Sequence, residues 1–142
     1  MNEFDPGQFR NQPFVKRIEK PWGYEILFTT ADLPYAGKIL HVEAGKQLSL
    51  QWHDLKQETQ FLSSGRCMRV ADDGQGNLVE TEMVPHQGYT IMPGQRHRLR
   101  GITDCDVFEV STPEIGVTHR LQDDYKRPDE TEDMRQQDRA RN

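Results

Sequence analysis

Residues 45–65 read GKQLSLQWHDLKQETQFLSSG, and polar and apolar side chains alternate through the first half of this run. In a strand, period-two alternation places Ser49, Gln51 and His53 on one face and the intervening apolar residues on the other. A polar face that points into a protein interior needs partners, and a metal ion would supply one. Glu58 begins the next strand across a short turn, so we expect its carboxylate to reach back toward His53.

The rest of the chain reads as a series of short strands. Runs rich in β-branched and aromatic residues predict strands at 24–29, 38–42, 47–53, 59–63, 66–71, 78–84, 89–92, 97–101, 107–111 and 117–121. Turn residues separate them, most clearly at Ser64-Gly65 and at residues 72–77. No sustained helical period occurs before the tail. The pattern predicts an all-β sandwich or barrel.

The length of 142 residues suits one domain, which we divide into three parts. Residues 1–19 are polar and broken by prolines, so we expect an arm. Residues 20–122 hold the predicted barrel. Residues 123–142 are almost wholly charged and polar, and this composition favours disorder for much of the tail, with a helical turn or two within 129–139.

The composition and charge of the chain limit the classes of partner that it is expected to bind. The formal net charge of -5 argues against nucleic acid, although Arg96, Arg98 and Arg100 form a local basic cluster that suits a small anionic ligand. Cys67 and Cys105 lack Cys-x-x-Cys spacing and are expected to be core thiols. No run resembles a signal peptide or reaches the ~18 apolar residues of a membrane span, so we expect a cytoplasmic protein.

A second histidine adds to the candidate metal site. The turn at 93–96 delivers His97 to the start of a strand. Together with His53 and Glu58 it offers nitrogen and oxygen ligands without thiolate, a set that suits zinc, iron, manganese, nickel or cobalt. Binding needs neutral histidines and an ionised glutamate. The three remaining predicted strand or surface histidines, His41, His86 and His119, belong to no such group.

These residues resemble the two motifs of the cupin family. The first motif, G-x5-H-x-H-x3-4-E-x6-G, is matched by Gly45, Gln51, His53, Glu58 and Gly65, with Gln51 in place of the first histidine. The second, P-x-G-x2-H, is similar to residues 93–97, with one residue fewer between proline and glycine. The resemblance implies a double-stranded β-helix, the jelly-roll barrel of cupins, that holds one divalent metal ion.

A narrower resemblance is to the mannose-6-phosphate isomerase-like branch of cupins. It rests on KPWGYE at 20–25, SLQWH at 49–53 and HRL at 97–99, and covers roughly residues 20–125. This branch implies that Gln51 is a true ligand beside His53, Glu58 and His97, and it favours zinc. The chain departs from the branch at Leu55, where a second histidine is common, and at Thr59-Gln60, where His-Trp is common.

The resemblance also suggests catalytic residues for an aldose–ketose isomerisation. Lys38 or Glu58 would move the proton, and Lys38 or Arg98 would bind a substrate phosphate. Alternation turns Arg98 away from the face of His97 unless the strand bulges, and a solvated surface charge is the alternative for Lys38 and for Arg98. Lys56, in the loop before Glu58, is expected to be exposed to solvent.

Three functions stay open on the sequence. The first is a metal-dependent sugar or sugar-phosphate isomerase. The second is a non-haem iron dioxygenase, because two histidines and one carboxylate form the facial triad of such sites. The third is a non-catalytic sugar-binding or regulatory protein, because one fold hosts many functions. Cupins commonly pair through their barrels, and an arm can add a strand to a neighbour's sheet edge, so a homodimer is expected.

Overall fold

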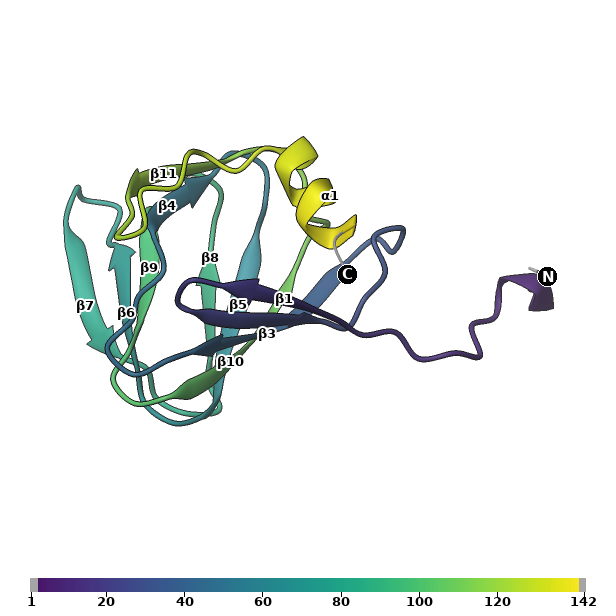
Figure 1. The fold of residues 1–142 in the computed structure, drawn as a ribbon, viewed down its shortest axis with the longest axis horizontal. Coiled ribbons are helices and arrows are strands. Elements are labelled where there is room, and N and C mark those ends of the chain that lie inside the picture. Colours follow the sequence, from purple (N-terminus) through teal and green to yellow (C-terminus); the bar gives the residue numbers. More distant parts are fainter. Residues whose placement is uncertain (1–2, 141–142) are drawn as a thin grey trace.

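The protein is seen in a computed structural model that describes residues 3–140, and these residues form two antiparallel sheets packed against each other (Figure 1). The larger sheet has the strand order β1 (Lys16–Lys20), β2 (Gly23–Leu27), β3 (Ala36–Val42), β10 (Cys105–Ser111), β5 (Glu58–Ser64) and β8 (Gly88–Ile91). The smaller has the order β11 (Thr118–Gln122), β4 (Leu50–His53), β9 (His97–Gly101), β6 (Cys67–Asp72) and β7 (Leu78–Glu82). The all-β prediction is confirmed.

Strand β1 lies where the sequence suggested only an arm. Its five residues pair with β2, from Lys16 opposite Leu27 to Lys20 opposite Gly23. Charged residues dominate it because it is an edge strand, and Arg17 lies over the ring of Tyr24 with its guanidinium carbon 3.8 Å from the centroid. Edge strands tolerate such charge, which removes the apolar pattern by which a strand is recognised. Residues 3–15 run away from the barrel in Figure 1.

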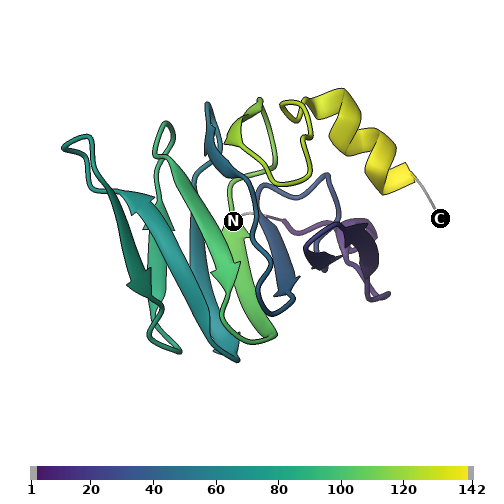
Figure 2. The same ribbon diagram turned by 60° about the vertical axis from the view of Figure 1, so that its left-hand side comes forward.

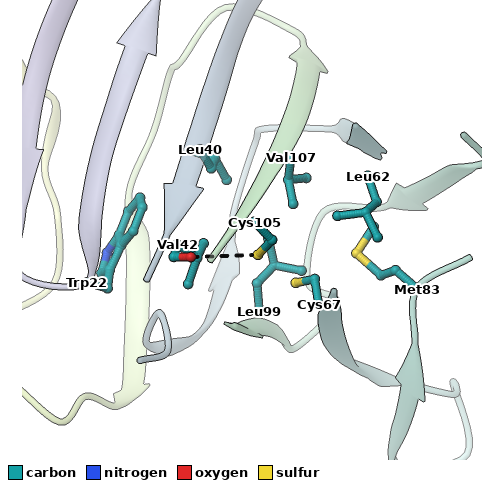
Figure 3. Packing of buried hydrophobic residues seen from close by; sticks show 9 residues of the cluster. All are labelled: Trp22, Leu40, Val42, Leu62, Cys67, Met83, Leu99, Cys105 and Val107. Carbon is teal, nitrogen blue, oxygen red and sulfur yellow. Dashed lines mark hydrogen bonds between the residues drawn. The ribbon is translucent and has the colours of Figure 1, made fainter. Parts of the chain in front are cut away.

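The hydrophobic core lies between the sheets and draws on both (Figure 3). Val42 and Val107 from the larger sheet and Cys67 from the smaller have no exposed surface. Cys67 and Cys105 are both buried and unlinked, which confirms the prediction of core thiols. The hydrogen bond with Cys105 and burial raise the pKa of Cys67, so this thiol stays protonated.

The turn between β5 and β6 depends on Gly65. Its φ of 75° lies in the left-handed region, and a Cβ there would lie 2.1 Å from the carbonyl oxygen of Asp104. No side chain fits so close to a backbone atom. At this turn the chain passes from the larger sheet to the smaller one.

The tail is ordered where its composition favoured disorder. Residues 123–131 return along β11, and Thr118 and Glu130 form an isolated bridge. The chain then forms helix α1 (Glu132–Ala140), which flanks one end of the barrel near β1 (Figures 1 and 2). Arg135 of this helix is 8% exposed and donates hydrogen bonds to the carbonyls of Glu114 and Gly116. Arg135, a charge of the tail, is therefore held by the barrel, which composition alone does not reveal.

In the part of the chain that the structure describes, α1 is too short and too polar to span a membrane.

Candidate metal centre

Three buried side chains from three strands converge at one end of the barrel. His53 ends β4, Glu58 begins β5 and His97 begins β9, and each is less than 5% exposed. One ligand atom from each lies within 4.8 Å of the others. Glu58 Oε1 lies 3.1 Å from His97 Nε2 and 3.7 Å from His53 Nε2. Since β4 and β9 belong to the smaller sheet and β5 to the larger, the group joins the two sheets.

The two histidines direct their Nε2 atoms toward Glu58 Oε1. His97 Nδ1 donates a hydrogen bond to the Gln95 carbonyl at 2.8 Å, and His53 Nδ1 lies 2.9 Å from Thr118 Oγ1. Both Nε2 atoms, in contrast, are buried without a hydrogen-bond partner. Metal-binding histidines are characteristically held in this way through the second ring nitrogen. Two orphaned nitrogens beside a carboxylate therefore fit a divalent metal ion.

The protonation states also fit. Burial lowers the pKa of His53 to about 4, although the neighbouring Glu58 acts in the opposite direction. Burial alone would raise the pKa of Glu58, but Lys56, His53 and His97 outweigh it and hold that pKa well below its usual range. At neutral pH, His53 is therefore neutral and Glu58 is ionised, as metal ligation requires.

The turn before His97 explains how this ring is positioned. Gly94 N–H donates to the carbonyl of His53 at 2.8 Å, so the turn is tied to β4. The Gln95 side chain accepts from Met92 N–H and donates to the carbonyl of Asp72. Because its side chain and carbonyl are both engaged, Gln95 fixes the strand entry and the His97 ring together.

Gln51, the fourth predicted ligand, lies beside the triad. It pairs with His97 across β4 and β9 and lines the same cavity. Its Oε1 accepts a hydrogen bond from Ser49 Oγ at 2.6 Å, which engages one of the two lone pairs of that oxygen. The ligand role of Gln51 stays a prediction.

Lys56 is buried, so the expected exposure was wrong. It is 6% exposed, and its Nζ lies 3.0 Å from Glu58 Oε2, 2.9 Å from Glu109 Oε2 and 3.6 Å from Glu114 Oε1. The loop between β4 and β5 turns this side chain inward, where it pairs with three carboxylates. A buried charge is stable only when it is paired. A loop position in the sequence carries no sign of such partners.

Lys38 also points into the barrel and is not a solvated surface charge. Its Nζ lies 2.7 Å from Glu114 Oε1, 3.2 Å from Glu25 Oε1 and 3.5 Å from Glu109 Oε2. Burial by itself would lower the pKa of Lys38, but Glu25 and Glu109 outweigh it and raise that pKa. Lys38 is therefore a positively charged ammonium inside the cavity.

Arg98 lines the cavity, and two of its nitrogens donate hydrogen bonds to backbone carbonyls. Its Nε donates to the carbonyl of Leu48 at 3.0 Å and its Nη2 to that of Gln122 at 3.4 Å. Its predicted role in binding a substrate anion stays a prediction.

The cavity around the triad has a volume of about 60 Å³ and is rich in charge. Sequence reasoning missed Glu109, although alternation along β10 places it on the buried face with Cys105 and Val107. Burial and the neighbouring Glu58 raise the pKa of Glu109, with Lys56 and Lys38 acting in the opposite direction. The other charged lining residues that the sequence did not single out are Lys20, Glu25, Glu114, Arg120, Arg127, Glu130 and Arg135.

The three histidines set aside from the site do lie elsewhere. His41 Nδ1 lies 2.7 Å from Asp106 Oδ1, the ring of His119 stacks on Trp52, and that of His86 stacks on Phe61. None of the three lines the cavity. His41 lies in β3, His119 in β11 and His86 in the loop between β7 and β8, which agrees with the prediction of strand or surface positions.

Comparison with known proteins identifies solved structures that share this architecture. No protein-family model and no curated protein matches the sequence. Solved structures of oxalate decarboxylases do match in shape. The formate complex of the Lactobacillus farciminis enzyme has a TM-score of 0.65 at 20% identity, over 79% of this chain and 36% of that one. A Bacillus subtilis oxalate decarboxylase studied for its Mn(II) centres has a TM-score of 0.68 at 18% identity, over 82% and 34%.

This chain has the cupin fold. It spans about a third of the length of the matched structures, and at such low identity the likeness extends to the fold alone. The finer prediction, the isomerase-like branch of cupins, gains no support from these structures and stays a prediction.

Proposed function

We propose that this cupin is a divalent-metal enzyme that transfers protons on a small anionic substrate, with aldose–ketose isomerisation of a sugar phosphate as the reaction class. The observation that carries the proposal is the convergence of three buried ligand atoms, two of them orphaned nitrogens, beside buried acid–base side chains. The sugar substrate comes from the motif resemblance, and the proton chemistry comes from the geometry.

A bound divalent ion would supply Lewis-acid stabilisation of negative charge on substrate oxygens. Nitrogen and oxygen donors suit zinc, which the resemblance favours, and equally manganese, the ion of the B. subtilis decarboxylase. His53, His97 and Glu58 would hold it, with Gln51 as the proposed fourth ligand.

Glu109 is the proposed base. Its Oε2 lies 2.9 Å from Lys56 Nζ and 3.5 Å from Lys38 Nζ, so two ammonium groups hold the carboxylate in place while it takes a proton from one substrate carbon and returns it to the neighbouring carbon. Glu58, a candidate base from the sequence, has Oε1 facing the two histidines and Oε2 facing Lys56. That carboxylate is therefore committed to holding the site.

The charge of the cavity supports an anionic substrate. Seven lysine or arginine side chains and five glutamates line it, an excess of two positive charges in a protein of net charge -5. A divalent ion would add two more. Such a concentration of positive charge attracts anions.

The volume of the cavity favours a second candidate. About 60 Å³ holds an ion and a few further atoms, well below the ~300 Å³ at which ordinary ligand pockets begin. A small dicarboxylate is closer to this volume than a sugar phosphate is, and oxalate is the substrate named for the structural neighbours. Decarboxylation of such an acid is therefore the second reaction class.

Metal content and two substrates test the proposal. Protein purified without added metal or chelator should carry about one zinc or manganese per chain, and mannose 6-phosphate and oxalate would then be offered. Glu109→Gln should lose turnover and keep its metal, whereas Glu80→Gln, at an exposed ion pair with Arg100, should keep both. Iron with oxygen consumption would move the assignment to the oxygenase. Failure to take up any divalent ion would refute the enzyme and favour a binding protein.

A further inference from the structure

Glu114, in the loop between β10 and β11, meets four basic side chains. Its Oε1 lies 2.7 Å from Lys38 Nζ and 3.6 Å from Lys56 Nζ, on the barrel side. Its Oε2 lies 4.0 Å from Arg135 Nε and also pairs with Arg139, on the α1 side. The side chain is 6% exposed. A single carboxylate thus bridges cations of the barrel and of the C-terminal helix.

The same residue separates two cavities. Lys38, Glu114 and Arg135 line both the metal cavity and a second cavity of about 480 Å³. The second cavity lies between the β2–β3 loop, the β10–β11 loop and α1, and its walls include Tyr35 and Ile115. Its volume falls within the ~300–1,000 Å³ of ordinary small-molecule sites. A ligand too large for the metal cavity would fit if the wall opened.

Among the residues that separate the two cavities, Glu114 is the carboxylate that can most easily move away from the lysines. Its competitors for the lysines, Glu25, Glu58 and Glu109, sit in strands whose backbones are fixed by sheet pairing, whereas Glu114 lies in a loop. Arg139 meets no other carboxylate within 4 Å among residues 3–140, and its Nε is buried without a partner. Arg139 therefore gives this group of cations a donor that no partner engages.

We infer that these cations form an oxyanion-binding site that Glu114 fills when substrate is absent. The anionic group of the substrate displaces the Glu114 carboxylate and binds Lys38, Arg135 and Arg139. The displacement joins the two cavities, so the rest of the molecule extends to the metal ligands on one side and into the larger cavity on the other. This inference rests on the proposed function and names its substrate class, an oxyanion larger than the metal cavity.

The expected size of the effect follows from competition. When an internal group occupies a site for 90–99% of the time, the apparent affinity of an outside ligand falls about 10- to 100-fold. Removing the Glu114 charge should therefore tighten anion binding by at least about tenfold.

Inorganic phosphate tests this inference by calorimetric titration of the full chain after metal removal, because a bound metal would itself attract phosphate. Glu114→Gln should bind phosphate at least about tenfold more tightly than the unaltered protein. Glu114→Gln with Arg139→Gln should lose that gain. Glu82→Gln, which removes an equal charge from an exposed ion pair with Arg66, should change nothing. Oxalate titrated in parallel separates a phosphate site from a carboxylate site.

Several results would contradict the proposed oxyanion-binding site. Unchanged phosphate and oxalate affinity in folded Glu114→Gln would overturn the inference, as would an equal gain in Glu82→Gln. If the amide variant does not fold, Glu114→Asp keeps the charge but draws it back from the cations, and its affinity should lie above that of the unaltered protein. Because no turnover or metal is involved, phosphate binding without isomerase activity would refute the proposed reaction and leave this site standing.

Discussion

Glu130→Gln should destabilise the protein by about 3 kcal/mol at pH 7 and leave the metal ligands in place. Glu130 Oε1 lies 3.0 Å from Arg135 Nε, and Oε2 lies 3.3 Å from Arg120 Nη2. Burial alone would raise the pKa of Glu130, but Lys20, Arg135 and Lys38 outweigh it and lower that pKa to about 2. The pKa of Glu130 falls from its ordinary 4.5 to about 2. Each pKa unit corresponds to about 1.4 kcal/mol, which gives the stated free energy of unfolding.

The direction of the Glu130 pKa shift determines the pH range over which its stabilisation is lost. Because the folded pKa of Glu130 lies below the unfolded one, the unfolded chain binds more protons between pH 4.5 and about 2. The stabilisation is therefore fully present above pH 4.5 and is lost as the pH falls toward 2. The glutamine variant lacks this contribution at every pH, so the difference between the two proteins should shrink on acidification.

Urea denaturation of both proteins from pH 7 down to pH 2.5 measures that difference. Glu80→Gln is the matched control, since its exposed ion pair with Arg100 should be worth about 1 kcal/mol or less. A loss below about 1 kcal/mol at pH 7, or a gap that stays constant from pH 5 to pH 2.5, would refute the reasoning.

Three further outcomes follow from the geometry. Thr118→Val removes the hydroxyl beside His53 Nδ1 and should weaken metal binding about 10- to 100-fold in calorimetric titration, with full affinity in the variant as the contrary result. His97→Ala should lose most metal affinity and Gln51→Ala less, because a neutral amide is the weaker ligand; elemental analysis after dialysis would show the order, and a reversed order would make the amide a principal ligand. Gly65→Ala, whose Cβ would lie 2.1 Å from a backbone oxygen, should lower the melting temperature by several degrees, and an unchanged value would show that the turn can relax.

The strands and the triad could be predicted because their signals are local. Period-two alternation around Gln51 and His53 identified β4, and the turn before His97 identified the entry to β9. Glu58 was found from its short distance in sequence to His53. Each of these inferences needed only a few neighbouring residues.

The charged wall of the cavity could not be predicted, because its partners come from distant segments. Lys56 is a loop residue whose burial depends on Glu109 and Glu114. The buried position of Arg135 likewise depends on Glu130 and on carbonyls of the β10–β11 loop. A charged sequence reads as solvated until the pairing of its charges is known, which is also why α1 was underestimated.

The placement of the three ligand atoms on both sheets has a consequence for the order of folding. His53 and Glu58 flank one short loop, so their half of the site can form as soon as β4 and β5 meet. His97 arrives on β9 from much later in the sequence, and contacts between distant segments form slowly because a long loop must close first. A complete set of ligands exists only after the two sheets have closed, so the rate of tight metal uptake during refolding would report that closing step.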